Sequence, residues 1–286
     1  MSAPRISVVL PVLAPTPFLR AMTEFAIKSL RVHAVEQFEL IVVEAAYDHF
    51  NPKKAVFYQG NDYQGTPTEP SVLLFKQDID EAQQIDKYLN FIPPVGGVKE
   101  INAGIDAASG EFILLTGSDV IAPPGWDAEL LRIFAGIPDC GVASLSAYEP
   151  NATIGPMGPL PLVVEGMFSP FMMIRNGRGW RFDEAFERVY QDSDLVLRMR
   201  TAGLHPYRSC CTHVWHLGSV TNKSAGEDHV AAHAASLARD ERLFYERWAN
   251  CPYATFAMIR GGAQIYGREH EAYTAKINLH YDPEKP

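Results

Sequence analysis

The sequence of 286 residues lacks several features that would place it in a familiar class of protein. It contains no apolar run near the ~18 residues that a membrane-spanning helix needs, and its start shows no secretory signal pattern. Its four cysteines include no Cys-x-x-Cys pair, so a structural zinc site is not expected. These absences predict a cytoplasmic protein without a transmembrane segment, whose thiols are free and buried.

Two nucleotide-binding motifs are also missing. No Gly-x-Gly-x-x-Gly follows the first predicted strand, and no Gly-x-x-x-x-Gly-Lys-[Ser/Thr] occurs, which argues against a dinucleotide dehydrogenase and a P-loop enzyme. The 25 basic residues are outnumbered by 34 acidic ones, which gives a net charge of −9. Because an acidic protein repels nucleic acids at long range, general nucleic-acid binding is disfavoured.

The spacing of apolar residues predicts strands that alternate with helices in the first half of the chain, and a smaller mixed portion in the second. Strand–helix–strand units of this length build parallel sheets with right-handed crossovers. We therefore predict an α/β fold with a mixed, mostly parallel sheet and helices on both faces. Strands are expected at 6–10, 38–43, 71–75, 112–115, 141–145, 171–174 and 212–217, and helices at 18–33, 76–88, 98–108, 126–134, 190–202 and 228–248.

No internal repeat or low-complexity tract divides the chain. We expect one domain over residues 1–250, with a nucleotide-binding half at 1–120 and an acceptor-side half at 121–250. Residues 251–286 form a C-terminal extension. Two segments rich in Gly and Pro, 47–70 and 151–161, are expected to be surface loops that carry specificity.

One acid stands alone in the segment E-F-I-L-L-T-G-S-D-V-I-A-P-P-G-W, residues 111–126. Asp119 follows a buried strand, and no basic residue lies near it in sequence. Such an acid caps a turn or the next helix in many proteins. Alternatively, ligands of open α/β sheets bind at the carboxyl ends of strands, where a carboxylate holds a hard cation that arrives with a nucleotide diphosphate.

Three more polar residues have similar positions. Glu44 ends the second strand, Asp192 lies at the start of the 190–202 helix, and His216 ends the last strand. Each has a structural alternative: a solvated strand end for Glu44, a helix N-cap for Asp192, and a core histidine for His216. His213, on the same strand, competes with His216.

In their order along the chain, these motifs resemble the family-2 glycosyltransferases of the GT-A fold. The resemblance covers about the first 250 residues. The matching segments are I-S-V-V-L-P-V at 6–12, L-I-V-V-E at 40–44, the Asn-x-Gly helix, Gly-Glu-aromatic strand and D-x-D-like turn within 101–126, R-F-D-E at 181–184, Q-D-S-D-L-V-L-R at 191–198, H-L-G-S at 216–219 and Y-E-R-W at 245–248.

The resemblance implies an inverting, metal-dependent enzyme that moves one sugar from a nucleotide diphosphate sugar, with a UDP-sugar expected, to an acceptor hydroxyl. It implies that Asp192 is the catalytic base. Asp119 and His216 would hold Mn²⁺ or Mg²⁺, and this mixed ligand set favours Mn²⁺. Contacts to the donor are expected from Pro11, Glu44, Asn102, Ser118 and Asp119, with Glu44 and Asn102 on the base and ribose.

The sequence departs from the family pattern at several positions. Gly117 replaces the first acid of D-x-D, Gln191 replaces the Glu before the base, and Ile101 stands where an arginine is common. We therefore expect a weak metal site that forms mainly with the donor bound. Arg175, Arg178 and Arg181 line the acceptor side or form a solvated turn.

Two other functions are compatible with the sequence: a nucleotide-sugar or glycan-binding protein without catalysis, and a nucleotidyltransferase on a related fold. The second usually needs a Gly- and Lys-rich loop after the first strand, which residues 12–17 do not provide. The sequence does not identify the acceptor, which is a glycan, a lipid-linked precursor, a protein or a modified nucleic acid, nor does it set the oligomeric state.

Overall fold

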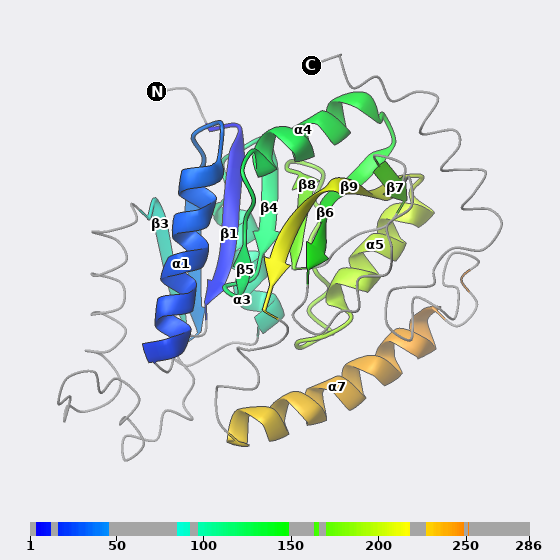
Figure 1. The fold of residues 1–286 in the computed structure, drawn as a ribbon. Helices are drawn as coiled ribbons and strands as arrows, with labels where there is room; N and C mark the ends of the chain where they lie inside the picture. The colour runs from blue at the N-terminus through cyan, green and yellow to red at the C-terminus, as the bar shows by residue number, and fades with distance from the viewer. Residues whose placement is uncertain are drawn as a thin grey trace.

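The structure is a computed structural model that describes residues 4–12, 17–45, 85–91, 97–148, 163–165, 170–217, 227–248 and 251. Within these residues, nine strands form one mixed sheet in the order β3-β2-β1-β4-β8-β6-β9-β5, and β7 pairs with β9 (Figure 1). The strands are β1 (Ile6–Val12), β2 (Glu39–Ala45), β3 (Lys87–Phe91), β4 (Phe112–Thr116), β5 (Val120–Ile121), β6 (Cys140–Tyr148), β7 (Val163–Glu165), β8 (Phe171–Arg175) and β9 (His205–His216). The helices are α1 (Pro17–His33), α3 (Gly97–Ala107), α4 (Trp126–Gly136), α5 (Gln191–Thr201) and α7 (Glu227–Trp248).

The pairing of the strands brings most of their C-terminal ends to one edge of the sheet. β1, β2, β3 and β4 run parallel to one another. β8 runs against both β4 and β6, so β6 has the direction of β4, and β9 is parallel to β6. Six strands, β1, β2, β3, β4, β6 and β9, therefore end at the same edge, which we call the carboxyl edge. In Figure 1 it is the lower end of the sheet.

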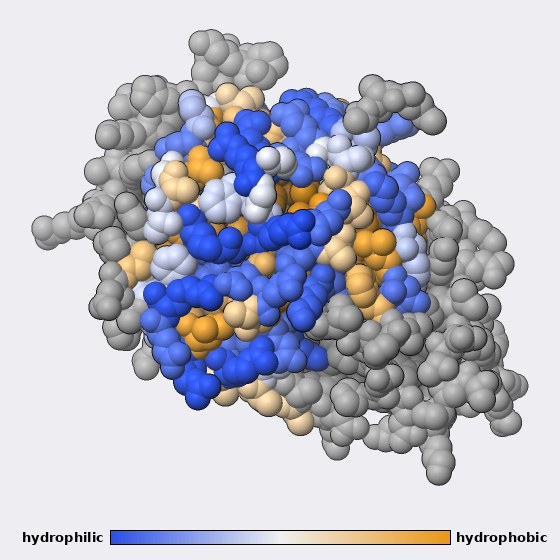
Figure 2. Space-filling view, turned by 180° about the vertical axis from the view of Figure 1, so that it is seen from behind, coloured by the Kyte–Doolittle hydropathy of each residue, from blue (hydrophilic) through white to orange (hydrophobic). Residues whose placement is uncertain are grey.

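Helices cover both faces of this sheet. Side chains alternate between the two faces of a strand, and the buried residues accordingly divide into two clusters. The first cluster packs strand residues such as Val8 and Leu114 under α1 and α4. The second packs Val9, Ile113 and Val142 under α3, α5 and α7. We call these the α1/α4 face and the α3/α5 face. Figure 2 views the molecule from the side opposite to Figure 1, where the described surface is mainly hydrophilic.

Gly104 allows α3 to lie unusually close to the sheet. A Cβ atom at this position would come within 2.5 Å of Val9 Cγ1 and 2.8 Å of Val43 Cγ2. Both contacts are too short for any side chain, so the helix would have to move away from β1 and β2. The Asn-x-Gly pattern of the sequence thus has a packing reason.

The segment that ends in Pro-Pro-Gly-Trp is fixed to the C-terminal end of α1. The buried carboxylate of Asp127, in the first turn of α4, accepts the backbone N–H groups of Val35 and Glu36 at 2.7–3.0 Å. Trp126 is fully buried and donates its indole N–H to Leu30 O at 3.2 Å. These bonds hold the chain that follows Asp119 in a defined position.

Most predicted elements are confirmed, with three corrections. The predicted helix at 76–88 is wrong at its end, because Lys87–Phe91 forms strand β3 beside β2. The last strand begins at His205 rather than at 212, and the short strands β5 and β7 were not predicted. The predicted boundary between the two halves, 120/121, lies inside β5. The predicted strand at 71–75, the loop at 151–161 and the excursion at 47–70 lie outside the described residues.

Two predicted absences concern membranes and disulfides. None of the helices among the described residues combines the length and the hydrophobicity that crossing a bilayer requires. The four cysteines are free, as predicted, but only Cys140 is buried; Cys211 is exposed, so the prediction of uniformly buried thiols is wrong.

Candidate active site

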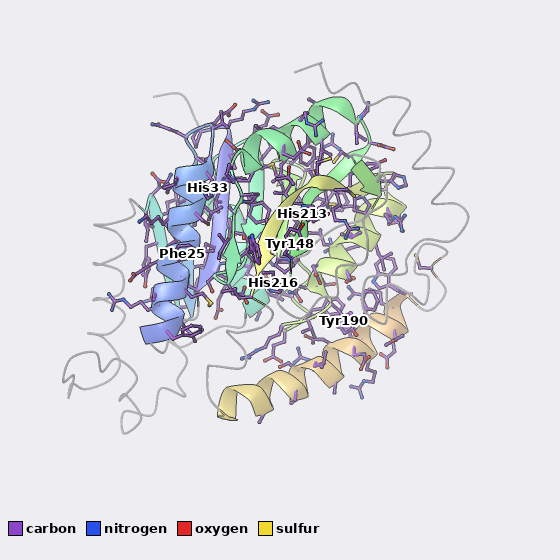
Figure 3. All side chains as sticks on the ribbon, viewed as in Figure 1. Phe25, His33, Tyr148, Tyr190, His213 and His216 are labelled. Atoms are coloured by element: carbon purple, nitrogen blue, oxygen red, sulfur yellow. The ribbon has the colours of Figure 1, made fainter. Side chains whose placement is uncertain are left out.

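The fold brings the predicted site residues to the carboxyl edge of the sheet. Glu44 is the penultimate residue of β2, Asp119 follows β4, and His216 closes β9. Asp192 reaches the same edge from α5. Since His205 pairs with Cys140 at the opposite edge, α5, which leads into β9, ends there and must begin at the carboxyl edge. Figure 3 shows Tyr190 and His216 at this end of the molecule.

Asp119 and His216 lie side by side. Val120 pairs with His216 across β5 and β9, and the N–H of Leu217 donates to the backbone oxygen of Asp119 at 3.0 Å. His216 Nε2 is 3.6 Å from Asp119 Oδ2, which is too long for a direct hydrogen bond. Two ligands of one Mn²⁺, each about 2.1 Å from the ion, lie about 3 Å apart, so a small rotation would place both atoms on one cation.

The described residues offer a small set of metal ligands. No group of three or more His, Cys, Asp or Glu residues in the part of the chain that the structure describes is arranged to hold a metal ion. Asp119 and His216 therefore fit a divalent ion only when the diphosphate and water supply most of its other ligands. The weak, donor-dependent metal site therefore stays a prediction from the sequence.

Gly117 has a steric role beside Asp119. A Cβ atom at position 117 would lie 2.8 Å from Asp119 Oδ1, so the Asp119 carboxylate occupies space that any larger residue would take. The hydroxyl of Thr116, at the end of β4, is buried and has no hydrogen-bond partner within the described residues. An unsatisfied buried hydroxyl is unusual in a folded protein, and this one lies at the carboxyl edge, at the end of β4.

Glu44 is buried, and its environment changes its acidity. The phenolic O–H of Tyr88, on the adjacent strand β3, donates to Glu44 Oε2. Burial raises the pKa of Glu44 to about 7, although the hydrogen bond from Tyr88 and the charge of Arg20 oppose the shift. Glu44 is therefore not a solvated strand end, and a carboxyl group that titrates near neutral pH faces the first half of the carboxyl edge.

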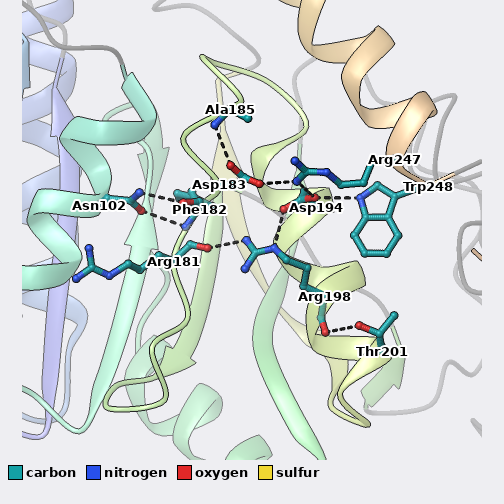
Figure 4. A network of polar contacts seen from close by, with 10 residues as sticks. All are labelled: Asn102, Arg181, Phe182, Asp183, Ala185, Asp194, Arg198, Thr201, Arg247 and Trp248. Carbon is teal, nitrogen blue, oxygen red and sulfur yellow. Dashed lines mark hydrogen bonds and ion pairs between the residues drawn. The ribbon is translucent and has the colours of Figure 1, made fainter.

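Asn102 has partners other than the predicted ribose. Its Oδ1 accepts the N–H of Phe182 at 3.0 Å, and its Nδ2 donates to Phe182 O at 2.9 Å and to Glu184 Oε1 at 3.4 Å (Figure 4). Both amide hydrogens are thus used within the protein. Asn102 joins α3 to residues 181–184, and its predicted contact with the donor stays a prediction. Ser118 is buried next to Asp119, and Pro11 is half-buried near the end of β1.

Asp192 is half-buried in the first turn of α5. The N-cap is Tyr190, which makes no side-chain capping bond, so the alternative that Asp192 is the N-cap is wrong. Across the described residues, no hydrogen bond or ion pair engages its carboxylate. The side-chain Oε1 of the preceding Gln191 is also buried without a partner in this part of the chain. Two adjacent side chains at the start of α5 therefore keep acceptor atoms for a ligand.

Tyr190, two residues before Asp192, has a strained backbone. Its φ of 62° lies in the left-handed region, which costs a bulky residue energy. Its ring stacks on Phe244 of α7, with centroids 4.9 Å apart and planes at 25°. Packing against α7 thus holds the turn that presents Asp192. Sequence reasoning missed Tyr190, since nothing in the sequence indicates its φ.

Asp194 has a different role from Asp192. It is fully buried, and it accepts hydrogen bonds from Arg198 Nε at 2.7 Å, Arg247 Nη1 at 2.8 Å and Trp248 Nε1 at 3.0 Å (Figure 4). Arg247 also pairs with Asp183 at 2.6 Å. These bonds connect α5 to the end of α7. The i,i+4 spacing of Asp194 and Arg198 was a readable signal for part of this network.

Asp240 fixes the residues that lead into α5. Its Oδ2 accepts the backbone N–H groups of Glu187, Arg188 and Val189 at 3.0, 2.9 and 3.1 Å. The side chain is fully buried on α7, and Arg239 contacts its other oxygen at 3.1 Å. A single carboxylate thus orients three successive amides of the segment 187–189.

The basic turn has mainly structural partners. Arg175 pairs with Glu111 at 3.3 Å and lies over the rings of Phe112 and Phe134. Arg181 pairs with Asp106. Both ion pairs are surface contacts between residues of the same part of the fold, which favours the structural alternative for these two arginines.

Comparison with known proteins shows the fold. No protein-family model matches the chain, and no curated protein matches it either. Solved structures do match. The structure of S. aureus TarS 1-349 in complex with UDP aligns with a TM-score of 0.54 at 12% identity, over 89% of this chain and 75% of that one. The chain has a GT-A fold, as predicted.

Two further structures of the same protein agree. The complex of S. aureus TarS 1-349 with UDP-GlcNAc gives a TM-score of 0.51 at 14% identity, over 96% of this chain and 79% of that one. A longer S. aureus TarS structure gives 0.53 at 13% identity, and there this chain spans 46% of the other. At these identities the likeness concerns the arrangement of the elements and not the side chains of the site.

Proposed function

We propose that this protein is an inverting glycosyltransferase, similar to family 2, which transfers one sugar from a nucleotide diphosphate sugar to an acceptor hydroxyl. We further propose that the nucleotide is UDP and that Asp192 is the general base. The fold supports the donor class, because structures of the same fold hold UDP and UDP-GlcNAc. The observation that carries the proposal is the carboxylate of Asp192, which has no partner among the described residues and stands at the carboxyl edge.

The chemistry of glycosyl transfer explains why such a carboxylate is needed. The acceptor hydroxyl loses its proton as its oxygen attacks the anomeric carbon, and a positioned carboxylate that takes the proton is worth ~10²–10⁴ in rate. Attack from the face opposite the leaving diphosphate inverts the anomeric configuration. Asp192 suits this role because, unlike Asp194, its oxygens are not occupied by arginine and indole N–H groups.

The other residues of the edge serve the donor. Glu44, paired with Tyr88, would bind the nucleotide base, and Pro11 would shape that pocket. Ser118 would contact the donor next to Asp119. Mn²⁺ or Mg²⁺, held by Asp119 and His216, would supply neutralisation of the charge on the leaving diphosphate.

Calorimetry and a turnover assay on the same samples test the proposal. Wild-type protein should bind UDP, more tightly with Mn²⁺, and should hydrolyse or transfer at least one sugar from a panel of UDP-sugars. Asp192→Asn should keep UDP affinity within about twofold and lose roughly 10² or more of the turnover. Glu246→Gln on α7 is the matched control, because the Glu246 side chain is 67% exposed and its ion pair with Arg242 is a loose one of 3.8 Å.

A binding protein without catalysis is the second candidate. Gly117 in place of an acid and a two-residue metal-ligand set favour it. UDP binding without turnover on any donor, and identical behaviour of Asp192→Asn and wild type, would establish the binder and exclude the enzyme. No binding of any nucleotide would exclude both.

A further inference from the structure

Three aromatic side chains lie in a row across the ends of β6 and β9. The ring of Tyr148 stacks on His213, with centroids 4.5 Å apart and planes at 28°. On the other pair, Tyr148 and Trp215 have centroids 5.4 Å apart and planes at 36°. The three rings thus form a nearly continuous surface, which we call the aromatic shelf. Figure 3 shows Tyr148 and His213 beside each other above His216.

The aromatic shelf lies on the α3/α5 face of the sheet. Ala147 of β6 and Val214 of β9 pack with the core cluster under α1 and α4. Because successive side chains of a strand point to opposite faces, Tyr148, His213 and Trp215 point to the other face. Asp192 begins α5, the helix that covers this face, so the shelf and the proposed base lie on the same side of the sheet.

The shelf is also adjacent to the proposed donor site. Trp215 immediately precedes His216 and pairs with Ile121, which is two residues after Asp119. The shelf therefore lies at the carboxyl edge, within one or two strand residues of the pair Asp119–His216. By the same alternation, the side chain of His216 points to the α1/α4 face, so His216 and the shelf lie at the same edge of the sheet but on opposite faces of β9.

Trp215 exposes a large apolar surface on which a ligand could pack. The residue is 55% exposed, whereas Trp126 is completely buried. Burial and the charge of Arg208 lower the pKa of His213, which favours the uncharged imidazole ring over the imidazolium. A pyranose fits such a surface, because its ring C–H groups form an apolar face while its hydroxyls point outward to water and to polar side chains.

We propose that Tyr148, His213 and Trp215 form the stacking surface for a pyranose ring of the acceptor. That the bound sugar is the acceptor rests on the proposed function, whereas the binding of a pyranose ring to the shelf does not. Among the acceptor classes that the sequence leaves open, this one selects a glycan or a glycoconjugate that presents a ring, rather than an open-chain polyol or an amino-acid hydroxyl alone.

Saturation-transfer NMR tests the shelf without knowledge of the natural acceptor. The probes are methyl pyranosides with gluco, galacto, manno and N-acetylgluco configurations, and sorbitol serves as the open-chain control. Wild-type protein should transfer saturation to at least one pyranoside, most strongly to the axial C–H protons, and not to sorbitol. Trp215→Ala should weaken this binding about fivefold or more, and Trp215→Phe, which retains a ring, should weaken it less.

The controls separate stacking from general damage. Phe25→Ala removes another exposed aromatic ring, 56% exposed, from α1 on the opposite face, and it should leave pyranoside binding unchanged. Thermal midpoints of all variants should stay near that of wild type, since Trp215 is mostly in solvent. Tyr148→Ala is the second variant, and it should reproduce the loss.

The possible outcomes distinguish a failure of the shelf proposal from a failure of the proposed function. Binding of no pyranoside, equal binding by Trp215→Ala, or equal binding of sorbitol overturns the shelf, whatever UDP does. If UDP does not bind while pyranosides bind through Trp215, the proposed function fails and the shelf stands as a glycan site. If Trp215→Ala instead loses UDP affinity in calorimetry and pyranosides are unaffected, the shelf belongs to the donor base and the proposal is wrong.

Discussion

Replacement of Asp240 is expected to disorder the start of α5 more than it disturbs the rest of the fold. The carboxylate is fully buried and accepts three backbone N–H groups of residues 187–189 at 2.9–3.1 Å. These residues lead directly into Tyr190 and Asp192. Without the carboxylate, three amides lose a charged acceptor at once, and the strained turn at Tyr190 loses part of what holds it.

The magnitude follows from the hydrogen bonds. A bond to a charged acceptor contributes about 1.5–3 kcal/mol and a neutral one about 0.5–1.5 kcal/mol. Asp240→Asn keeps one acceptor oxygen but loses the charge, so about 1 kcal/mol per bond gives a loss of roughly 2–3 kcal/mol. Asp240→Ala removes the acceptor entirely, and by comparison with other buried charge partners its cost is about 3–5 kcal/mol.

Urea unfolding and donor assays measure the two consequences. Asp240→Asn and Asp240→Ala should lower the free energy of unfolding in that order. Turnover should fall more than UDP affinity, because the Asp240 carboxylate bonds to residues 187–189, whereas Glu44 lies on β2 and Asp119 lies in the turn between β4 and β5. The control Glu246→Gln removes an exposed carboxylate from the same helix and should change stability by less than about 0.5 kcal/mol. If Asp240→Asn is as mild as this control, the structural reasoning about the segment 187–189 is refuted.

Two further predictions concern the donor side of the site. Gly117→Ala should leave the free energy of unfolding within about 1 kcal/mol of wild type, yet weaken Mn²⁺-dependent UDP binding about tenfold in calorimetry. The reason is that the added Cβ would lie 2.8 Å from Asp119 Oδ1 and would push the carboxylate away. Unchanged UDP binding would show that Asp119 is not placed for the metal. Glu44 should lower protein stability as pH rises from 4.5 towards 7, since its pKa is raised to about 7 in the folded state and the folded state keeps its proton longer. Glu44→Gln has no proton to lose, so in urea unfolding it should equal wild type near pH 4 and exceed it at pH 8, by up to about 3 kcal/mol. A difference that does not grow with pH would contradict the burial effect.

The sequence predicted well the elements whose patterns are visible within a short stretch of the chain. The strands at 6–10, 38–43 and 112–115 are mainly apolar runs with helices of clear period between them, and parallel pairing follows from that order. The predicted helix at 76–88 failed at its end because Lys87–Phe91 is a short, half-buried edge strand whose sequence, K-Y-L-N-F, shows no regular alternation of apolar and polar residues. Its pairing with β2, not its own composition, makes it a strand.

The second half was less predictable because its strands depend on long-range partners. β9 runs over twelve residues, His205–His216, with an irregular register against β6 between Leu145 and Ser146. An irregularity of this kind interrupts the period of two that identifies a strand in sequence, so only the segment from 212 onward was recognised. The aromatic shelf was missed for the same reason, since Tyr148 and Trp215 are 67 positions apart and meet only through this pairing.

The polar residues of the site have different roles because the fold gives them different partners. Most of these partners cannot be read from the sequence. In Tyr-Gln-Asp-Ser-Asp, Asp192 and Asp194 are equivalent by composition, and both lie in the first turn of α5. The helix period of 3.6 residues turns them about 200° apart, so only one can face the core. Asp194 does, and there a carboxylate is tolerable only with charged and N–H partners, which Arg198, Arg247 and Trp248 provide. The same geometry directs Asp192 away from these partners. A base must keep an oxygen available for the hydroxyl proton. Asp192, which has no partner among the described residues, meets this requirement and Asp194 does not, and this difference is the reason for proposing Asp192 as the base.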